Sequence, residues 1–121
     1  MAEAAGLICA ASALVERGCG VRFQIATPNG PLDAFVVRFL GQVHGYVNRC
    51  AHAKVELDWP SGEFFDRAGQ YLLCKTHGAA YRPESGVCVI GPCKGARLMQ
   101  VKVQEINGRV FLMDGKEAIH V

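Results

Sequence analysis

The chain has 121 residues, of which 50% are hydrophobic and 20% charged, and its formal net charge at pH 7 is +2. This length and composition are typical of one globular domain that buries a core without disulfide bonds or a metal. The small net charge argues against nucleic acid or anionic lipid as a partner, and no apolar stretch reaches the ~18 residues that span a bilayer.

The first half of the chain predicts a series of short antiparallel strands. Apolar runs and period-two alternation stand there between turn sequences rich in glycine, proline and asparagine, above all at residues 27–31. We expect strands at residues 6–12, 21–25, 35–40 and 43–48. The last of these strands runs directly towards Cys50.

The second half predicts a long connection with little strand character, followed by two hairpins. We expect strands at residues 71–73, 80–82, 87–90, 98–105 and 109–113. Asn107 and Gly108 give the strongest hairpin signal of the chain, and the strict alternation of residues 98–105 predicts one continuous strand before them. Because no repeat and no convincing helix is visible, the predicted fold class is all-β.

Two short motifs each combine one cysteine with one histidine: Cys50 with His52, and Cys74 with His77. A structural zinc finger usually groups its cysteines in one knuckle and its histidines in the other. The order Cys, His, Cys, His instead suits a [2Fe-2S] centre in which one iron takes two cysteines and the other takes two histidines. Two facing loops must then each supply one cysteine and one histidine, as these motifs do.

Followed by Gly78, Tyr81, Gly86 and the pair Gly91-Pro92, the motifs resemble the Rieske iron-sulfur proteins, most closely the small soluble Rieske ferredoxins of ring-hydroxylating dioxygenase systems. The resemblance implies one domain over residues 1–121, with antiparallel sheets in a base subdomain and an inserted cluster-binding subdomain at about residues 49–92. It also implies one [2Fe-2S] cluster as the cofactor. The residues that it assigns to the cluster site are Cys50, His52, Cys74, His77, Gly78, Tyr81, Gly91 and Pro92.

On this resemblance the cluster is held asymmetrically. Cys50 and Cys74 would bind the inner iron, and His52 and His77 the outer iron at the tip of the domain. Two neutral imidazoles in place of two thiolates make the cluster less negative, so that such potentials span roughly −150 to +300 mV instead of lying near −400 mV. Gly78 would permit close approach of the backbone to the cluster.

The surroundings of the motifs predict a potential in the lower or middle part of that range. High-potential members of the family have a serine two residues after the last histidine ligand, where this chain has Ala79, and a tyrosine that corresponds to Tyr81. They also join the two loops by a disulfide, which the residues Val55 and Thr76 cannot form. We expect the hydroxyl of Tyr81 to donate a hydrogen bond to the sulfur of Cys50.

A single [2Fe-2S] centre moves one electron and has no substrate pocket, so we expect an electron carrier and not an enzyme. The resemblance implies a ferredoxin that accepts electrons from a flavoprotein reductase and passes them to an oxygenase, docking at the tip that carries His52 and His77. The alternatives are a Rieske subunit of another redox enzyme, such as a nitrite-reductase small subunit, a redox sensor, or a structural zinc domain.

The remaining cysteines and basic residues have plainer expected roles. We expect free thiols in a reducing compartment for Cys9, Cys19, Cys88 and Cys93, although the last two flank Gly91-Pro92 and could approach each other. The apolar run at residues 4–15 follows Glu3 and lacks a clear cleavage site, so a cytoplasmic location is expected. The basic residues Lys94, Arg97 and Lys102 are expected to form a solvated edge or to meet an acidic partner.

Overall fold

The structure, a computed structural model, describes residues 6–49, 57, 63–74, 78–91, 94–113 and 118–120. These residues form strands and one short 3₁₀ helix, Ala11–Ala13, so the predicted all-β class is confirmed. No helix within these ranges has the length and apolar character that a membrane crossing requires.

The strands form three sheets in which all neighbouring strands are antiparallel. The central sheet has the order β11-β2-β3-β4-β8, with β2 (Val21–Ile25), β3 (Leu32–Phe39), β4 (Gln42–Val47), β8 (Gln100–Val101) and β11 (Ala118–His120). The second sheet has the order β1-β10-β9, with β1 (Leu7–Ala10), β9 (Val103–Ile106) and β10 (Arg109–Leu112). The third has the order β5-β6-β7, with β5 (Leu72–Cys74), β6 (Ala79–Tyr81) and β7 (Cys88–Ile90).

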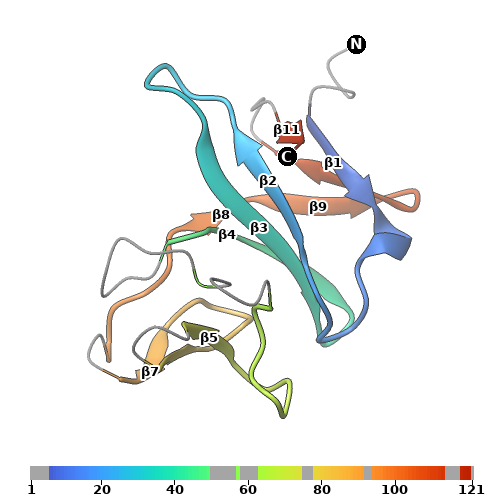
Figure 1. The fold of residues 1–121 in the computed structure, drawn as a ribbon. Coiled ribbons are helices and arrows are strands. Elements are labelled where there is room, and N and C mark those ends of the chain that lie inside the picture. The colour runs from blue at the N-terminus through green and yellow to red at the C-terminus, as the bar shows by residue number, and fades with distance from the viewer. Residues whose placement is uncertain are drawn as a thin grey trace.

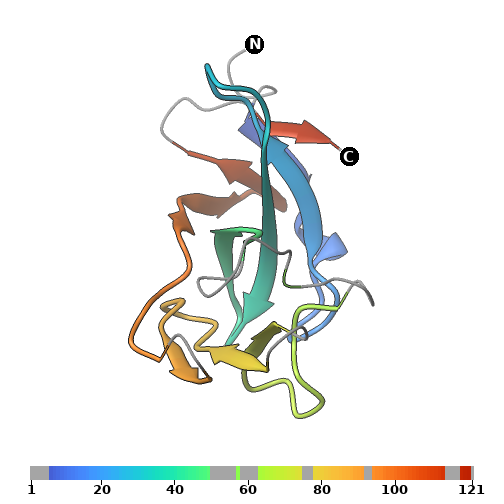
Figure 2. The ribbon, with the colours of Figure 1, turned by 60° about the vertical axis from the view of Figure 1, so that its left-hand side comes forward.

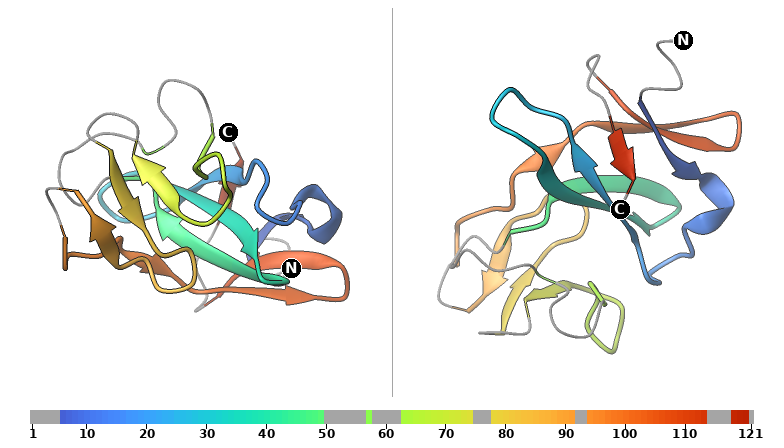
Figure 3. Two further views of the ribbon diagram at one scale, coloured as in Figure 1. Left: turned by 90° about the horizontal axis from the view of Figure 1, so that it is seen from below. Right: turned by 45° about the horizontal axis from the view of Figure 1, so that its top comes forward.

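The β5-β6-β7 sheet and the strands β1 and β11 lie at opposite ends of the molecule (Figures 1 and 2). Seen from below, the β3–β4 hairpin runs between the yellow strand β6 and the blue N-terminal segment (Figure 3). The three strands of the third sheet all fall between β4 and β8 in the sequence. The β5-β6-β7 sheet is therefore formed by a stretch of chain that leaves the central sheet after β4 and returns to it at β8.

Strand β3 holds the two halves of the core together because both of its faces are buried. Phe35 and Val37 belong to one core cluster with residues of the β5-β6-β7 sheet, whereas Ala34 and Val36 belong to another with residues of β1 and β10. The ring of Phe35 stacks on that of Phe64, with centroids 4.1 Å apart. A slip of one residue would exchange the two faces, so the register of β3 is strongly specified.

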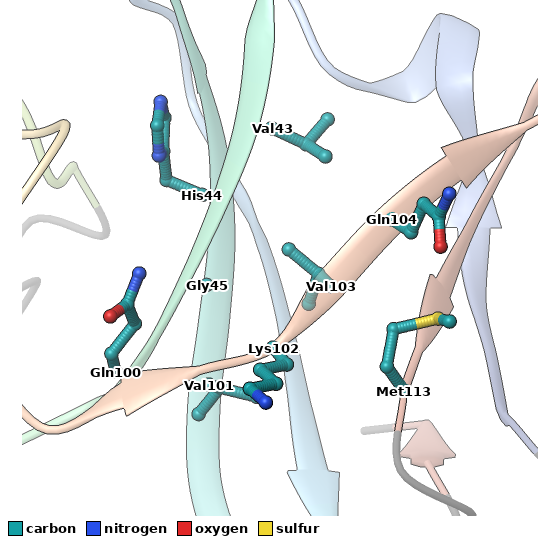
Figure 4. A pocket seen from close by; sticks show the side chains of 9 residues that line it. All are labelled: Val43, His44, Gly45, Gln100, Val101, Lys102, Val103, Gln104 and Met113. Carbon is teal, nitrogen blue, oxygen red and sulfur yellow. The ribbon is translucent and has the colours of Figure 1, made fainter.

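The prediction of one continuous strand over residues 98–105 is wrong. The chain leaves the central sheet after Val101, which pairs with Gly45 of β4, and joins the second sheet at Val103. At Gly45 the crossing is so close that a Cβ there would lie 2.9 Å from Cγ1 of Val103 (Figure 4). The alternation was a poor guide here because it reports which side chains face inward and not which strand is the partner.

A carboxylate from the preceding segment holds the turn between β3 and β4. The N–H groups of Leu40 and Gly41 donate to the two carboxylate oxygens of Glu16, at 2.6 and 2.8 Å. The bond from Gly41 is the largest of the effects that hold the pKa of Glu16 below its ordinary value of 4.5. The folded state therefore prefers the charged carboxylate.

We expect the substitution Glu16→Gln to destabilise the protein at neutral pH but not in strong acid. A lowered folded-state pKa contributes stability above the ordinary value, and that contribution is lost as the pH falls through the folded-state pKa. Urea unfolding of wild type and variant from pH 7 downwards measures the difference. The substitution Glu84→Gln, which removes an exposed turn carboxylate, is the control, and a Glu16→Gln effect that persists in strong acid would contradict the assignment.

Candidate metal centre

The structure describes Cys74, Gly78, Tyr81 and Gly91 among the eight residues that the sequence assigns to the site. The other four lie outside the described residues, and their roles stay predictions: Cys50, His52, His77 and Pro92. Val55, Thr76 and Cys93 also lie outside the described residues. The site is therefore built here from the strands and turns that lead into and out of the two motifs.

Cys74 ends strand β5 at the interior of the molecule. Its exposed fraction is 0%, and it lies opposite Ala79 in the β5–β6 ladder. The N–H of Gly78 donates to the carbonyl oxygen of Cys74 at 2.9 Å, so the two ends of the second motif are held together. Gly78 has a φ of +73°, in the left-handed region where glycine is favoured. This glycine therefore allows the backbone to turn immediately after the second motif.

The segment after β7 packs against the backbone that follows the second motif. Gly91 has a φ of +109°, and a Cβ at this position would lie only 2.9 Å from the Cα of Ala79. Any other residue at position 91 would push this segment away from β6. The assignment of Gly91 and Pro92 to the cluster site stays a prediction.

Asn48 is a positioning residue that sequence reasoning missed. It follows β4, two residues before Cys50, and is the one polar residue classed as buried in the described part of the chain, at 4% exposure. Its Oδ1 accepts the N–H of Leu57 at 2.9 Å, and its own N–H donates to the carbonyl of Asp33 at 2.9 Å. Asn48 and Leu57 thus fix the two ends of the segment that contains Cys50 and His52. The only signal in the sequence was an asparagine at the end of an apolar strand.

Tyr46 attaches the β5-β6-β7 sheet to the central sheet. Its hydroxyl donates to the carbonyl of Pro83 at 2.6 Å, in the turn between β6 and β7. A Cβ at Gly86, in the same turn, would lie 2.8 Å from Cε1 of the Tyr46 ring, so only glycine fits there without displacing the ring. Burial raises the pKa of Tyr46 above its ordinary value, so the phenol stays a neutral donor over the physiological range.

A hollow of about 380 Å³ lies beside β4 and β8. In Figure 4, Val43, Val103 and Met113 lie on one side of β4, and His44 and Gln100 on the other. The lining contains no cysteine or carboxylate, and burial lowers the pKa of His44, which also interacts with the backbone of Phe39. His44 is therefore a half-buried strand histidine without a described metal-ligand neighbour in this hollow.

The described residues suit an iron-sulfur centre at the second motif. Cys74, Ala79 and Tyr81 are fully buried in one core cluster with Leu57 and Leu72. Apolar surroundings protect a thiolate-bound metal from water, and the closed turn holds the ends of the motif in place. Among the described residues alone, no group of three or more histidine, cysteine or acidic side chains comes together for a metal.

Comparison with known proteins gives a family and a fold. The sequence matches the family described as Rieske [2Fe-2S] domain over residues 8–107. The search of curated protein sequences gave no match. Among solved structures, the ferredoxin of carbazole 1,9a-dioxygenase from Nocardioides aromaticivorans IC177 is 18% identical with a TM-score of 0.67, over 88% of this chain and 93% of that one.

Two further solved structures have the same fold. The ferredoxin of Sphingomonas yanoikuyae B1 is 20% identical with a TM-score of 0.67, over 88% of this chain and 94% of that one. A complex of a fluorene-bound oxygenase variant and ferredoxin of carbazole 1,9a-dioxygenase matches with 21% identity and a TM-score of 0.71. That match covers 91% of this chain but 30% of the other, so this chain spans less than a third of the matched chain's length.

Proposed function

Because the chain belongs to the Rieske [2Fe-2S] domain family, we propose that it is a one-electron carrier, a ferredoxin that delivers electrons to an oxygenase. The observation that carries this proposal is the family match over residues 8–107, which contains both ligand motifs. The cofactor of this family is a [2Fe-2S] cluster, which supplies one-electron redox chemistry when bound. The two similar ferredoxins, which are matched over nearly their whole length, support the ferredoxin assignment.

The proposed ligands are Cys50 and Cys74 for the inner iron and His52 and His77 for the outer iron. The surrounding residues support this assignment by what they hold in place. The buried end of β5 presents Cys74 from the core, and the bond from Leu57 to Asn48 restrains the segment with the other two-ligand motif. Both restraints are made by the protein chain itself, so the chain contributes to the shape of the site.

The proposed acceptor is an oxygenase, and the proposed donor is a flavoprotein reductase that docks, like the acceptor, at the tip with His52 and His77. One of the similar structures is named as a complex of an oxygenase and a ferredoxin, which supports an oxygenase as the acceptor. A cytoplasmic location stays a prediction from the sequence.

Two measurements test the proposed function. Anaerobically purified protein is expected to be red-brown, to bleach on reduction, and to take up one electron per chain in a reductive titration. A colourless protein that carries zinc would contradict it. For the oxygenase partner, a source-cell extract depleted of this protein should lose aromatic-ring hydroxylation and regain it when the holoprotein is returned, whereas unchanged activity after depletion would contradict the assignment.

We expect the substitution Ala79→Ser to raise the midpoint potential by several tens of mV, since one added hydrogen bond of ~1–2 kcal/mol stabilises the reduced form. Ala79 lies opposite Cys74 in the β5–β6 ladder and is fully buried. Gly91, which packs against Ala79, has no side chain that would compete with the added hydroxyl for space. Redox titration of wild type and variant measures the shift. The control is Ala80→Ser, on the opposite face of β6, for which we expect no comparable rise.

A wild-type midpoint near the top of the family's range, or equal potentials for Ala79→Ser and wild type, would contradict the argument.

A further inference from the structure

The segment that connects β7 to β8 has a strongly exposed apolar side chain at each end. Ile90 is 54% exposed and Met99 67% exposed, and the five exposed large hydrophobic residues of the described chain are Val15, Leu40, Ile90, Met99 and Ile106. Single exposed apolar side chains are ordinary on a protein surface. The position of these two relative to the ligand motifs is what distinguishes them.

The two ends of this segment adjoin residues that flank the two ligand motifs. Beside Ile90, Gly91 packs on the backbone of Ala79, which follows the second motif. At the other end, the carbonyl of Met99 accepts the N–H of Val47 at 2.9 Å, three residues before Cys50. Ile90 therefore lies close to the residues that follow the second motif, and Met99 lies close to the strand that leads into the first motif.

Basic side chains lie between these two apolar ends. The N–H of Gly95 donates to the carbonyl of Cys88 at 2.9 Å, and the N–H of Cys88 donates to the carbonyl of Ala96 at 2.7 Å, so the segment returns alongside β7. The part of the segment that lies alongside β7 includes Lys94 and Arg97, whose side chains are exposed.

Arg82 adds a third charge to this surface. Its N–H donates to the carbonyl of Val87 at 2.9 Å, and Val87 pairs with Arg97 on its other side. Arg82 is exposed as well. Within the described part of the chain, the ion pairs are those of Arg17 with Glu16 and of Arg38 with Glu105, so these three cations are not neutralised there.

The net charge of the whole chain is concentrated here. The chain has 13 basic and 11 acidic residues, and residues 82–97 contain three of the basic ones and one acidic residue, Glu84. The rest of the chain therefore has ten of each and no net charge. The segments that carry these residues lie around β7, at the lower left of Figure 1. Residues 82–97 are thus a locally positive stretch of a chain that is otherwise without net charge.

We propose that Arg82, Lys94 and Arg97, with Ile90 and Met99 at the ends, extend the proposed docking surface beyond His52 and His77 and meet an acidic face of the electron acceptor. The inference rests on the proposed function and specifies the chemistry of the partner. Opposite charges steer the encounter and set the orientation, and the apolar ends lose water on contact. Because exposed ion pairs contribute little affinity one by one, the charges act chiefly on the rate of association and on its dependence on salt.

Mapping where an anion binds on the oxidised holoprotein tests the proposed docking surface directly. The probe is hexacyanochromate(III), a redox-inert paramagnetic trianion, titrated into isotope-labelled protein at low ionic strength. We expect broadening of the NMR signals of residues 82 and 94–99 before those of the β1-β10-β9 sheet, and reversal of the broadening by salt. Broadening that is scattered over the surface, or centred elsewhere, would overturn the proposal.

Matched charge reversals test whether binding of the probe depends on this surface or only on net charge. The substitution Arg97→Glu is expected to weaken binding of the probe by about fivefold at low ionic strength. Arg109→Glu makes the same change on exposed β10, in another sheet, and is expected to have little effect. Lys94→Glu repeats the test at a second position on the proposed surface. Equal weakening by Arg97→Glu and Arg109→Glu would mean that only net charge matters and would refute a local docking surface.

Electron transfer to hexacyanoferrate(III) separates this inference from the proposed function. One electron leaves the reduced holoprotein and converts iron(III) of the trianion to iron(II). Failure of wild type to transfer the electron would contradict the proposed function, wherever the inert probe binds. Transfer at a rate that Arg97→Glu and Lys94→Glu leave unchanged at low salt would contradict the docking surface alone, whereas a rate that is reduced about fivefold, and not by Arg109→Glu, supports it.

Discussion

The substitution Cys74→Ser is expected to abolish assembly of the [2Fe-2S] cluster, with loss of colour and of bound iron and acid-labile sulfide. A serine hydroxyl is a poor replacement for a thiolate ligand to iron. Because the side chain at position 74 is fully buried, water cannot easily take its place. Iron and sulfide analysis should fall from about two of each per chain to near zero.

The matched control is Cys88→Ser, at a cysteine that is almost as buried and belongs to the same core cluster. The Sγ of Cys88 donates to the carbonyl of Ile90 at 3.3 Å, a bond that a serine hydroxyl can also make. We expect this variant to keep the full content of iron and sulfide. Equal loss in both variants would attribute the effect to damage of the core, and full retention in Cys74→Ser would disprove the ligand assignment.

The second large effect is expected from Asn48→Leu. This change removes the acceptor for the N–H of Leu57, and an unsatisfied buried donor costs about 1–3 kcal/mol in the free energy of unfolding. It also releases one end of the segment that contains Cys50 and His52, so the cluster should be lost to an iron chelator faster than from wild type. Urea unfolding and the rate of bleaching by the chelator measure the two effects.

The control for this variant is Asn29→Leu, at an exposed position in the β2–β3 turn. Surface changes of this kind usually alter stability by less than ~0.5 kcal/mol, and we expect no change in cluster retention. If Asn48→Leu were as stable as Asn29→Leu and held iron equally well, Asn48 would not position the motif.

Local patterns predicted the strands that pair with their sequence neighbours. The predicted strand at residues 21–25 agrees with β2, and the hairpin turn at Asn107 and Gly108 joins β9 to β10 as expected. These elements are specified by residues next to each other, through alternation and through turn residues that tolerate a positive φ. The class of fold and the order of the hairpins could therefore be predicted well.

Long-range pairings were not predictable in the same way. The N-terminal strand β1 pairs with β10, about a hundred residues later, and the short β11 pairs with β2. Neither pairing leaves a mark in the periodicity of either strand. The break at Lys102 was missed for the same reason, because the alternation continues across a change of partner.

The sequence by itself determined the all-β class, the family and the candidate ligands Cys50, His52, Cys74 and His77, because metal chemistry depends on residue types and their spacing. Only the tertiary structure decided that Asn48 accepts a hydrogen bond from Leu57, and that Ile90 and Met99 lie close to the residues that flank the two motifs, with Lys94 and Arg97 between them in the chain. These relations join residues from different strands, and their proximity is set by how the sheets pack, which no local pattern of residues encodes.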